Sequence, residues 1–310
     1  MINLQGVSRW YGQVIGLNDV TCEIGPGVTA LLGMNGSGKS TMMRLITGQL
    51  YPTTGEVYVE GMKPFANPEV YKILGYCPEI DSFYEKMSGR EFVRAMGRLS
   101  GFSSAESKRR TDEMMEVVGM TDRCDKPIRG YSKGMRQRIK LAQAMLHDPQ
   151  CILLDEPLNG LDPVGRHEYI QILRSFAEKG KTILVSSHIL FEVEQMTRSI
   201  LLLHRGRLLA AGDLGVIREL LDKFPHRVRI ETEEVGDLAG YLVTLPYVHS
   251  LRKLRGGVEL QVTDPDSFYE TLPKVAEVVR EQNVKITKVS SPDNNLESIF
   301  RYLVGEVSNS

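Results

Sequence analysis

The sequence predicts an α/β protein with a mainly parallel sheet covered by helices on both faces, followed by a small α+β domain. The first part rests on two apolar, strand-sized runs, residues 151–154 and 182–185, which are separated by a helical stretch over about 163–179. Apolar strands that alternate with helices are typical of a parallel sheet. The second part rests on the order of elements after residue 224.

The first domain is expected over residues 1–215. It opens with strands, and residues 82–148 then form a helical insert, because apolar residues recur there at spacings of three and four. The expected elements before the insert are strands at 2–7, 17–24 and 28–32, a helix at 41–46 that ends near Gly48, a turn at 51–55 and a strand at 56–61.

The second domain is expected over residues 224–310. Its pattern gives strand, helix, two strands, helix and strand, which is the order of a ferredoxin-like unit. The expected elements are a strand at 227–233, a helix at 235–244, a hairpin of 248–255 and 258–263 through Gly256-Gly257, a helix at 266–282, a strand at 284–289 and a last helix at 295–303.

Composition and charge limit the classes of function and the cell compartment expected for this chain. The net charge of −1 gives no electrostatic case for nucleic acid as a partner. No apolar run approaches the ~20 residues that span a bilayer; the best candidate, residues 200–203, has the length of a strand. The first residues lack the basic start and apolar core of a signal peptide. The four cysteines are far apart, without metal-type spacing, and are expected as reduced thiols. A cytoplasmic protein is therefore expected.

The most informative stretch is residues 33–41, which fit G-x-x-x-x-G-K-[ST], the phosphate-binding loop. Backbone N–H groups of such a loop surround a polyphosphate, and the helix that follows turns its positive end to the anion. Lys39 is expected to reach the β- and γ-phosphates, and Ser40 to offer its hydroxyl to Mg²⁺. The remaining nucleotide-binding residues expected in the loop are Asn35, Gly36, Ser37, Gly38 and Thr41.

Polar residues follow two buried strands. Asp155 and Glu156 come directly after residues 151–154, and Ser186-Ser187-His188 ends the next buried strand, which is expected beside the first. Asp155 is expected to hold Mg²⁺ directly or through water, and Glu156 to polarise a water for attack on the γ-phosphate. His188 is expected to hydrogen-bond that phosphate.

A second anion site is expected where a helix begins near Ser132, inside the segment Tyr131-Ser132-Lys133-Gly134-Met135. Ser132 is a good N-cap, and a helix N-terminus with a serine and a glycine binds anions. Since it belongs to the helical insert, this site is expected to face the γ-phosphate held by a second copy of the chain.

In these motifs and their order the sequence resembles the ATP-binding cassette (ABC) family of transporter ATPases. The resemblance covers roughly residues 1–215 and implies a P-loop NTPase (RecA-like) core with an antiparallel β subdomain and a helical insert. The matching motifs are residues 33–41 (Walker A), 131–135 (signature), 151–156 (Walker B), Asn159-Gly160-Leu161-Asp162 (D-loop) and His188 (switch histidine).

The resemblance also implies roles that spacing alone does not give. Tyr11 matches the aromatic residue that stacks on adenine, and Asp162 belongs to the nucleotide-binding loops. Glu79 stands where most of the family has Gln; its carboxylate could contact Mg²⁺ or the attacking water, but it adds charge beside a polyanion. In the signature, Lys133 and Met135 replace Gly and Gln of Leu-Ser-Gly-Gly-Gln, and Lys133 either adds a positive charge or is solvated.

The subgroup that the chain most resembles is the ABC-2 exporter type, in which a short cassette pairs with separate membrane subunits. This implies an ATPase that dimerises head-to-tail around two ATP–Mg, lies at the inner face of the membrane and drives permease subunits, with residues 79–87 as the coupling segment. Two alternatives stay open: a soluble ABC ATPase outside transport, and a regulatory subunit with a remnant nucleotide site. The cargo is not encoded in these motifs.

Overall fold

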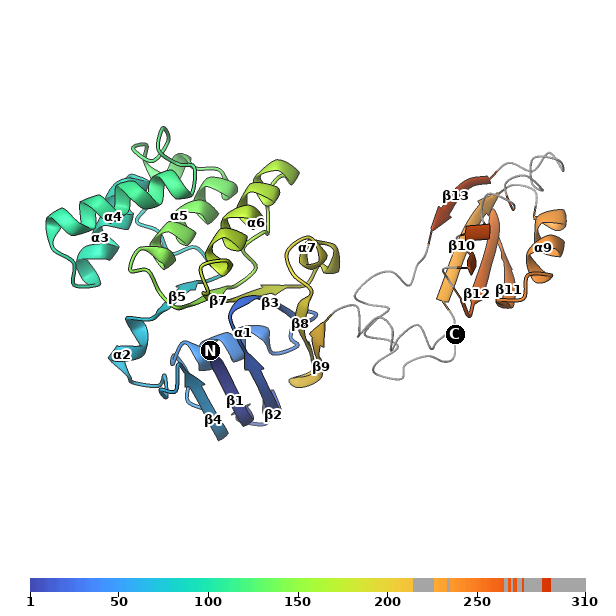
Figure 1. The fold of residues 1–310 in the computed structure, drawn as a ribbon, viewed down its shortest axis with the longest axis horizontal. Coiled ribbons are helices and arrows are strands. Elements are labelled where there is room, and N and C mark those ends of the chain that lie inside the picture. The colour runs from blue at the N-terminus through green and yellow to red at the C-terminus, as the bar shows by residue number, and fades with distance from the viewer. Residues whose placement is uncertain are drawn as a thin grey trace. The chain divides into compact units, whose positions relative to one another are not determined.

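The computed structural model describes residues 1–213, 226–232, 235–264 and 286–290, together with residues 267, 268, 270, 271 and 275. The chain divides into two compact units, Met1–Asp213 and Leu214–Ser310 (Figure 1). The helices of the first unit are α1 (Lys39–Ile46), α2 (Pro68–Tyr71), α3 (Gly89–Leu99), α4 (Ser104–Val117), α5 (Lys133–Met145), α6 (Pro163–Ala177) and α7 (Leu190–Glu194), with a 3₁₀ turn at Ile128–Gly130. Its strands are β1 (Ile2–Tyr11), β2 (Val14–Ile24), β3 (Gly27–Leu32), β4 (Thr54–Val59), β5 (Leu74–Cys77), β6 (Cys151–Leu154), β7 (Thr182–Ser187), β8 (Ser199–His204) and β9 (Arg207–Asp213).

The first unit is built around a six-stranded sheet with the order β5-β6-β7-β3-β8-β9. The strands from β5 to β8 are parallel, and the edge strand β9 runs antiparallel to β8. The strands β6 and β7 are neighbours, as the sequence predicted. Leu154 lies opposite Val185. The polar residues that follow these two strands therefore start from the same edge of the sheet.

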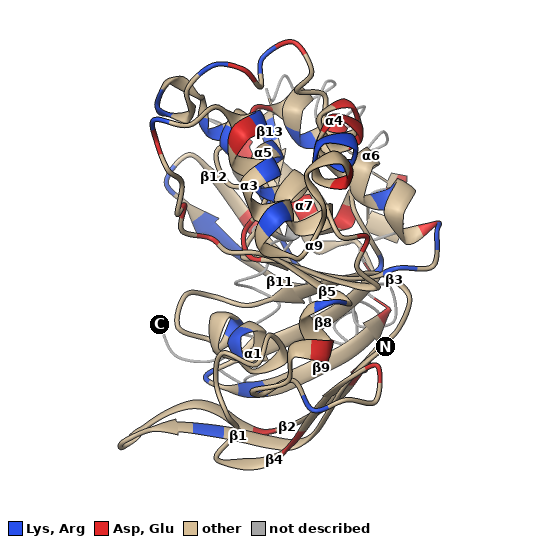
Figure 2. Ribbon diagram, turned by 90° about the vertical axis from the view of Figure 1, so that its left-hand side faces the viewer, with Lys and Arg blue, Asp and Glu red and all other residues tan. Residues whose placement is uncertain are grey.

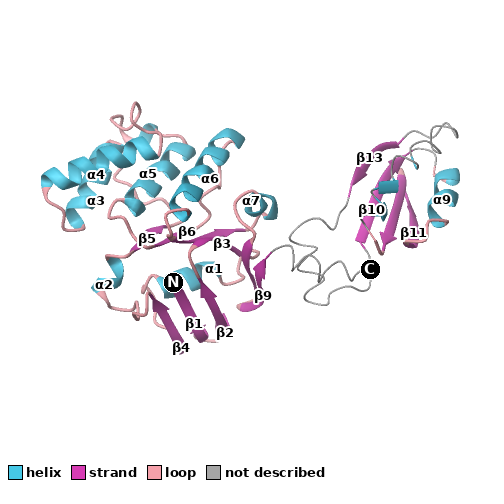
Figure 3. Ribbon diagram, in the orientation of Figure 1, coloured by secondary structure: helices cyan, strands magenta, loops and turns pink. Residues whose placement is uncertain are grey.

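The two faces of this sheet carry separate cores, because successive side chains of a strand point to opposite faces. On one face, Ile152 and Ile183 pack with α3, α5 and α6. On the other face, Leu153 and Leu184 pack with α1 and with residues of the small sheet β2-β1-β4, which is antiparallel throughout. Figure 3 shows the helices α3 to α6 gathered on one side of the large sheet and the small sheet on the other. The structure confirms the α/β class with an antiparallel subdomain and a helical insert.

The helical insert consists of α3, α4 and α5, and each of these helices begins at a serine. Ser88, Ser103 and Ser132 accept hydrogen bonds from the backbone N–H three residues on, and Ser88 forms a complete capping box with Glu91. Acidic and basic residues are interspersed along α4 (Figure 2), where ion pairs at helical spacing stabilise a solvated face.

The second unit is described over α9 (Gly236–Val243), β10 (His226–Thr232), β11 (Val248–Leu254), β12 (Gly257–Val262) and β13 (Ile286–Ser290). Its antiparallel sheet has the order β11-β12-β10-β13, so the last strand lies beside the first, as the ferredoxin-like pattern requires. Val228 and Ile230 of β10 pack with Leu238 and Leu242 of α9. Most of the helix expected over 266–282, the helix expected over 295–303 and the C-terminal tail lie outside the described residues.

Two strands of the large sheet were not predicted. The strand β5 has four residues and contains Gly75, which argues against a strand in sequence. The glycine is needed because the Ala144 carbonyl of α5 occupies the place of a side chain. The edge strand β9 contains Ala210, Ala211 and Gly212 and is half-exposed, so it lacks the apolar run of the central strands.

Candidate functional site

A cavity of about 510 Å³ opens at the carboxyl ends of the central strands. Twelve of the predicted site residues line it, from five separate parts of the first unit. They are Tyr11, Asn35, Gly36, Ser37, Gly38, Lys39, Ser40, Thr41, Glu79, Asp155, Glu156 and His188. The other three predicted residues, Ser132, Gly134 and Asp162, do not line it.

The phosphate-binding loop between β3 and α1 has the backbone of an anion cradle. Gly36 and Gly38 have φ of +79° and +109°, a region that other residues rarely adopt, and a Cβ on Gly38 would also overlap the Gly16 carbonyl. Helix α1 has no side-chain cap at Gly38, so its first N–H groups remain available to a ligand. The Ser37 hydroxyl is buried and has no hydrogen-bond partner among the described residues.

Lys39 is the first residue of α1, and only 7% of its side chain is exposed. Its ammonium donates to the Gly33 carbonyl at 2.6 Å and lies 3.6 Å from Glu156 Oε1. The lysine is therefore held across the loop, with its charge facing the carboxylates at the end of β6. Such a buried cation is placed to bind the outer phosphates of a nucleotide.

The acidic residues after β6 form a hydrogen-bonded group with the end of β7. The Ser186 hydroxyl donates to Asp155 Oδ1 at 2.5 Å and accepts the Glu156 backbone N–H at 2.8 Å. His188 Nδ1 lies 2.9 Å from Glu156 Oε2. Asp155 and Glu156 are 4% and 8% exposed. The pairing of β6 with β7 thus brings the two carboxylates after β6 together with the serine and the histidine at the end of β7.

Glu156 has a left-handed backbone, with φ of +49°. This conformation is uncommon outside glycine and costs of order 1 kcal/mol or more, so it persists only where neighbours enforce it. Here the Ser186 hydroxyl holds the Glu156 N–H, while Lys39 and His188 hold its carboxylate. Strain of this kind gathers at functional sites, which makes Glu156 the strongest candidate for a base.

Tyr11, at the end of β1, also lines the cavity, and its side chain is exposed. Its hydroxyl lies 3.4 Å from Thr41 Oγ1, and the Arg9 guanidinium lies 5.1 Å from its ring centroid. An exposed aromatic ring at the rim of a phosphate cradle is a platform on which a nucleobase can stack. Glu79 lines the cavity from the loop that follows β5.

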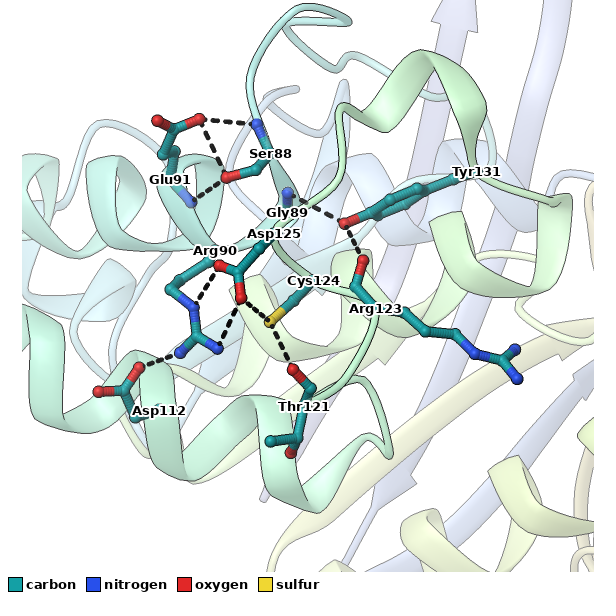
Figure 4. Close-up of polar contacts among 10 residues, drawn as sticks. All are labelled: Ser88, Gly89, Arg90, Glu91, Asp112, Thr121, Arg123, Cys124, Asp125 and Tyr131. Atoms are coloured by element: carbon teal, nitrogen blue, oxygen red, sulfur yellow. Dashed lines mark hydrogen bonds and ion pairs between the residues drawn. The ribbon is translucent and has the colours of Figure 1, made fainter.

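Ser132 and Gly134 lie at the start of α5, where the Ser132 hydroxyl accepts the Met135 N–H at 3.3 Å. Ser132 is exposed, but the residue before it is firmly held. Figure 4 shows the Tyr131 hydroxyl between the Gly89 N–H of α3 and the Arg123 carbonyl, at 3.2 and 3.1 Å. The serine is therefore presented outward from a rigid support. Asp162 caps α6 by accepting the Gly165 N–H.

The Lys133 side chain lies on the loop that follows Glu156. Gly160 has φ of +77°, and a Cβ there would overlap the Lys133 methylene stem. The stem therefore packs on the glycine, and both roles expected for Lys133, an added positive charge or a solvated side chain, stay predictions. Lys133 itself is an exposed residue.

None of the four cysteines lines the cavity. Burial raises the pKa of Cys77, the last residue of β5, to about 12, so that the thiol stays protonated. All four cysteines are free, and Cys77, Cys124 and Cys151 are buried. The structure thus pairs none of the four cysteines with another, and their reduced state stays a prediction.

The residues present fit a nucleotide with Mg²⁺. The loop supplies glycines, free N–H groups and the unpartnered Ser37 hydroxyl for phosphate, and Ser40 and Asp155 supply oxygens for a cation. Among the described residues, no cluster of three or more His, Cys, Asp or Glu side chains could hold a metal.

Sequence reasoning gave no role to Ser186 or Asn159. Ser186 is fully buried and bonds to both acidic residues, and Asn159 lines the cavity. A polar residue inside an apolar strand was a usable signal for Ser186, since a buried hydroxyl needs partners.

None of the helices in the described part of the chain has the length and apolar character to cross a membrane.

Comparisons with known proteins place this site in a family. Residues 17–159 match the ABC transporter family. The chain is 34% identical to the bacitracin transport ATP-binding protein BcrA of Bacillus licheniformis over 308 residues, which cover 98% of this chain and 97% of that protein. It is 33% identical to the Nod factor export ATP-binding protein I of Cupriavidus metallidurans, over 68% and 71% of the two chains.

Among solved structures, the chain resembles a dimeric ATP-binding cassette in a post-hydrolysis state with bound ADP and Pi. The TM-score is 0.63 and the identity 26%, over 69% of this chain and 99% of that one. The whole-length similarity to BcrA includes the second unit as well as the first. The chain belongs to the ATP-binding proteins of ABC transporters and is an ATP-hydrolysing subunit of such a transporter.

Proposed function

We propose that two copies of this chain close head-to-tail around two ATP–Mg and drive separate permease subunits in export. The observation that carries the proposal is the division of the site. The cavity gathers Lys39, Asp155 and Glu156, while Ser132 is presented outward from α5 and does not line it. A second copy that offers its own Ser132 and Gly134 would complete the phosphate shell.

Within one half-site, each residue has a distinct task. Lys39 and the N–H groups of the loop bind the phosphates, and Tyr11 stacks on adenine. Glu156 takes the proton of the attacking water, and His188, 2.9 Å from its carboxylate, orients it and contacts the γ-phosphate. Mg²⁺, held by Ser40 and Asp155 with Glu79 nearby, neutralises charge on the phosphates when bound.

The names of the relatives support the direction of transport that we propose. The name of the Cupriavidus relative states export, and BcrA matches the chain end to end. We assign residues 1–215 to nucleotide binding and 224–310 to an accessory role, with the subunit at the inner face of the membrane. The exposed side chains of Ile80 and Tyr84, in the loop after β5, are the contacts offered to a permease.

A mixing experiment tests the head-to-tail arrangement. Lys39→Ala removes the phosphate-binding cation, and Ser132→Ala removes the group offered to the partner, so each variant alone should hydrolyse ATP slowly. In a mixed pair, one site carries both changes and the other carries neither. We expect mixing to restore hydrolysis measured as phosphate release.

The matched control replaces Ser103, which caps α4 in the same way as Ser132 caps α5 but belongs to none of the predicted nucleotide-binding motifs. Ser103→Ala should retain full hydrolysis. If folded Lys39→Ala and Ser132→Ala chains stay inactive when mixed, although ATP still pairs them, each site takes Lys39 and Ser132 from the same chain and the head-to-tail arrangement is wrong.

A further inference from the structure

Helix α5 holds the loop that carries Glu79. Lys140, on the second half of α5, is 3% exposed, and its ammonium donates to the carbonyls of Pro78 and Glu79 at 2.8 and 3.1 Å. The same ammonium lies 3.0 Å from Asp81 Oδ1. One buried cation thus contacts three residues of the four that follow β5.

These contacts satisfy the ammonium. A lysine has three N–H donors, and the two carbonyls and one carboxylate provide an acceptor for each. Burial of a charge is costly unless it is paired in this way, and charged hydrogen bonds are the stronger kind. The backbone of Glu79 is therefore fixed relative to α5 at the point where its side chain enters the cavity.

A second basic residue extends the attachment by one helical turn. Arg136 lies four residues before Lys140, on the same face of α5. Its guanidinium donates to both carboxylate oxygens of Glu85 at 2.7 Å and lies 5.7 Å from the Phe83 ring. The segment over residues 78–85 is thus bound along the helix that begins at Ser132.

We propose that Lys140 is a positioning residue for ATP hydrolysis, which holds the Glu79 carboxylate toward the nucleotide and makes its loop move together with the Ser132 end of α5. The proposal rests on the roles given above to Glu79 and Ser132. It adds a specific device to them: a buried ammonium, rather than main-chain continuity, transmits a shift of the loop to the helix.

The chain supplies a matched control in Lys181. This lysine is 5% exposed, donates to the Pro149 carbonyl at 2.7 Å and pairs with Asp148 at 2.6 Å. It has the same chemistry as Lys140, a buried ammonium on a proline carbonyl and an aspartate. Neither of its acceptors lines the cavity, whereas Lys140 also holds the carbonyl of Glu79, which does. A purely structural effect of losing such an ammonium should therefore be equal at the two positions.

The test measures kcat and KM for ATP, with Mg²⁺, in the full chain with Lys140→Met, Lys181→Met, Glu79→Ala or Lys140→Met/Glu79→Ala. Methionine keeps an unbranched apolar stem and removes the ammonium. Misplacement of a group in the site by a fraction of an ångström lowers the rate steeply, so we expect Lys140→Met to lower kcat about 10-fold with KM changed less than about twofold. Lys181→Met should lower the thermal unfolding midpoint similarly and keep kcat.

The double variant decides the mechanism. If Lys140 acts through Glu79, Lys140→Met lowers kcat no further once Glu79 is alanine. Equal kcat values for Lys140→Met and Lys181→Met, or an undiminished loss in the Glu79→Ala background, would overturn the proposal. Failure of the role given to Glu79 looks different: Glu79→Ala alone would then hydrolyse ATP at the wild-type rate, and the positioning role would fall with it.

A second substitution keeps the test open if Lys140→Met does not fold. Asp81, one-third exposed, can become asparagine without burying an unpaired group. We expect Asp81→Asn to lower kcat about threefold, less than Lys140→Met because the two carbonyl bonds persist. This loss should also vanish in the Glu79→Ala background, and a wild-type kcat for Asp81→Asn would overturn the proposal.

Discussion

The cavity around Lys39 and the start of α5 at Ser132 differ in how far a single chain completes them. In the cavity, Lys39 and Glu156 are buried, and the carboxylate contacts both the lysine and a histidine. At the start of α5, Ser132 is exposed, and its hydroxyl bonds to the first turn of its own helix. The cavity holds the groups that bind the phosphates and activate the attacking water, whereas the start of α5 exposes a serine that a second copy can contact. This is the division expected of a site shared by two copies.

The largest expected effect separates these two regions. Glu156→Gln removes the base but keeps the shape of the side chain, so hydrolysis should fall by about 10²–10⁴, the usual contribution of a general base. Pairing through Ser132 needs no base, so ATP should still join two chains, measurable as a dimer by size-exclusion chromatography. Glu178→Gln, at the exposed end of α6, is the control. Rapid hydrolysis by Glu156→Gln would contradict the assignment.

A smaller effect is expected from Ser186, which no motif assigned. Ser186→Ala frees Asp155 Oδ1 and the Glu156 N–H, so kcat should fall about 10-fold as the carboxylates lose their placement. Ser187 is the matched control, since it is equally buried but bonds to the Ile189 N–H. Both alanine variants should lose stability of about 1–3 kcal/mol, the cost of an unsatisfied buried group. Equal kcat losses in the two variants would remove the special role of Ser186.

The smallest effect concerns the far end of α5. His147 Nε2 lies 3.2 Å from the Leu74 carbonyl of β5, and burial lowers the pKa of the ring below its usual 6.5. Because the unfolded chain then takes up the proton at a higher pH than the folded chain, this contribution to stability is full above pH 6.5 and is lost as the pH falls below it.

This titration is measurable as the thermal unfolding midpoint at about pH 7.5 and about pH 5.5. We expect the midpoint to drop less in His147→Gln than in the unchanged chain. An identical drop in the two would show that folding does not lower the pKa of this histidine. The result would sharpen the contrast between an α5 end that is anchored within the chain and one that is offered outward.

Much of this arrangement could be predicted from residue patterns. The apolar strands before Asp155 and His188 predicted a buried parallel sheet. Because these strands follow one another along the chain, they were also expected side by side, as the structure has them. What could not be predicted depends on contacts between distant segments. The strand β5 was hidden because Gly75, a strand breaker by propensity, accommodates the Ala144 carbonyl.

The same reason explains the residues that were missed in the site. Lys140 lies among ordinary helical residues, and nothing near it in sequence indicates that its ammonium meets a loop some sixty residues earlier. Ser186 was visible as a polar residue in an apolar strand, but its partners belong to β6. Motifs give the groups that touch a ligand, whereas the groups that hold them appear only when strands and helices are assembled.

The contact between Gly160 and Lys133 has a consequence for a paired enzyme. The glycine belongs to the loop that follows Glu156, and the lysine to the helix turn that carries Ser132. Any displacement of that loop on one side of the interface would press on the turn offered to the opposite nucleotide. Hydrolysis at one site would then influence hydrolysis at the other through one glycine and one aliphatic side-chain stem. The two sites would hydrolyse ATP in turn without a dedicated regulatory domain.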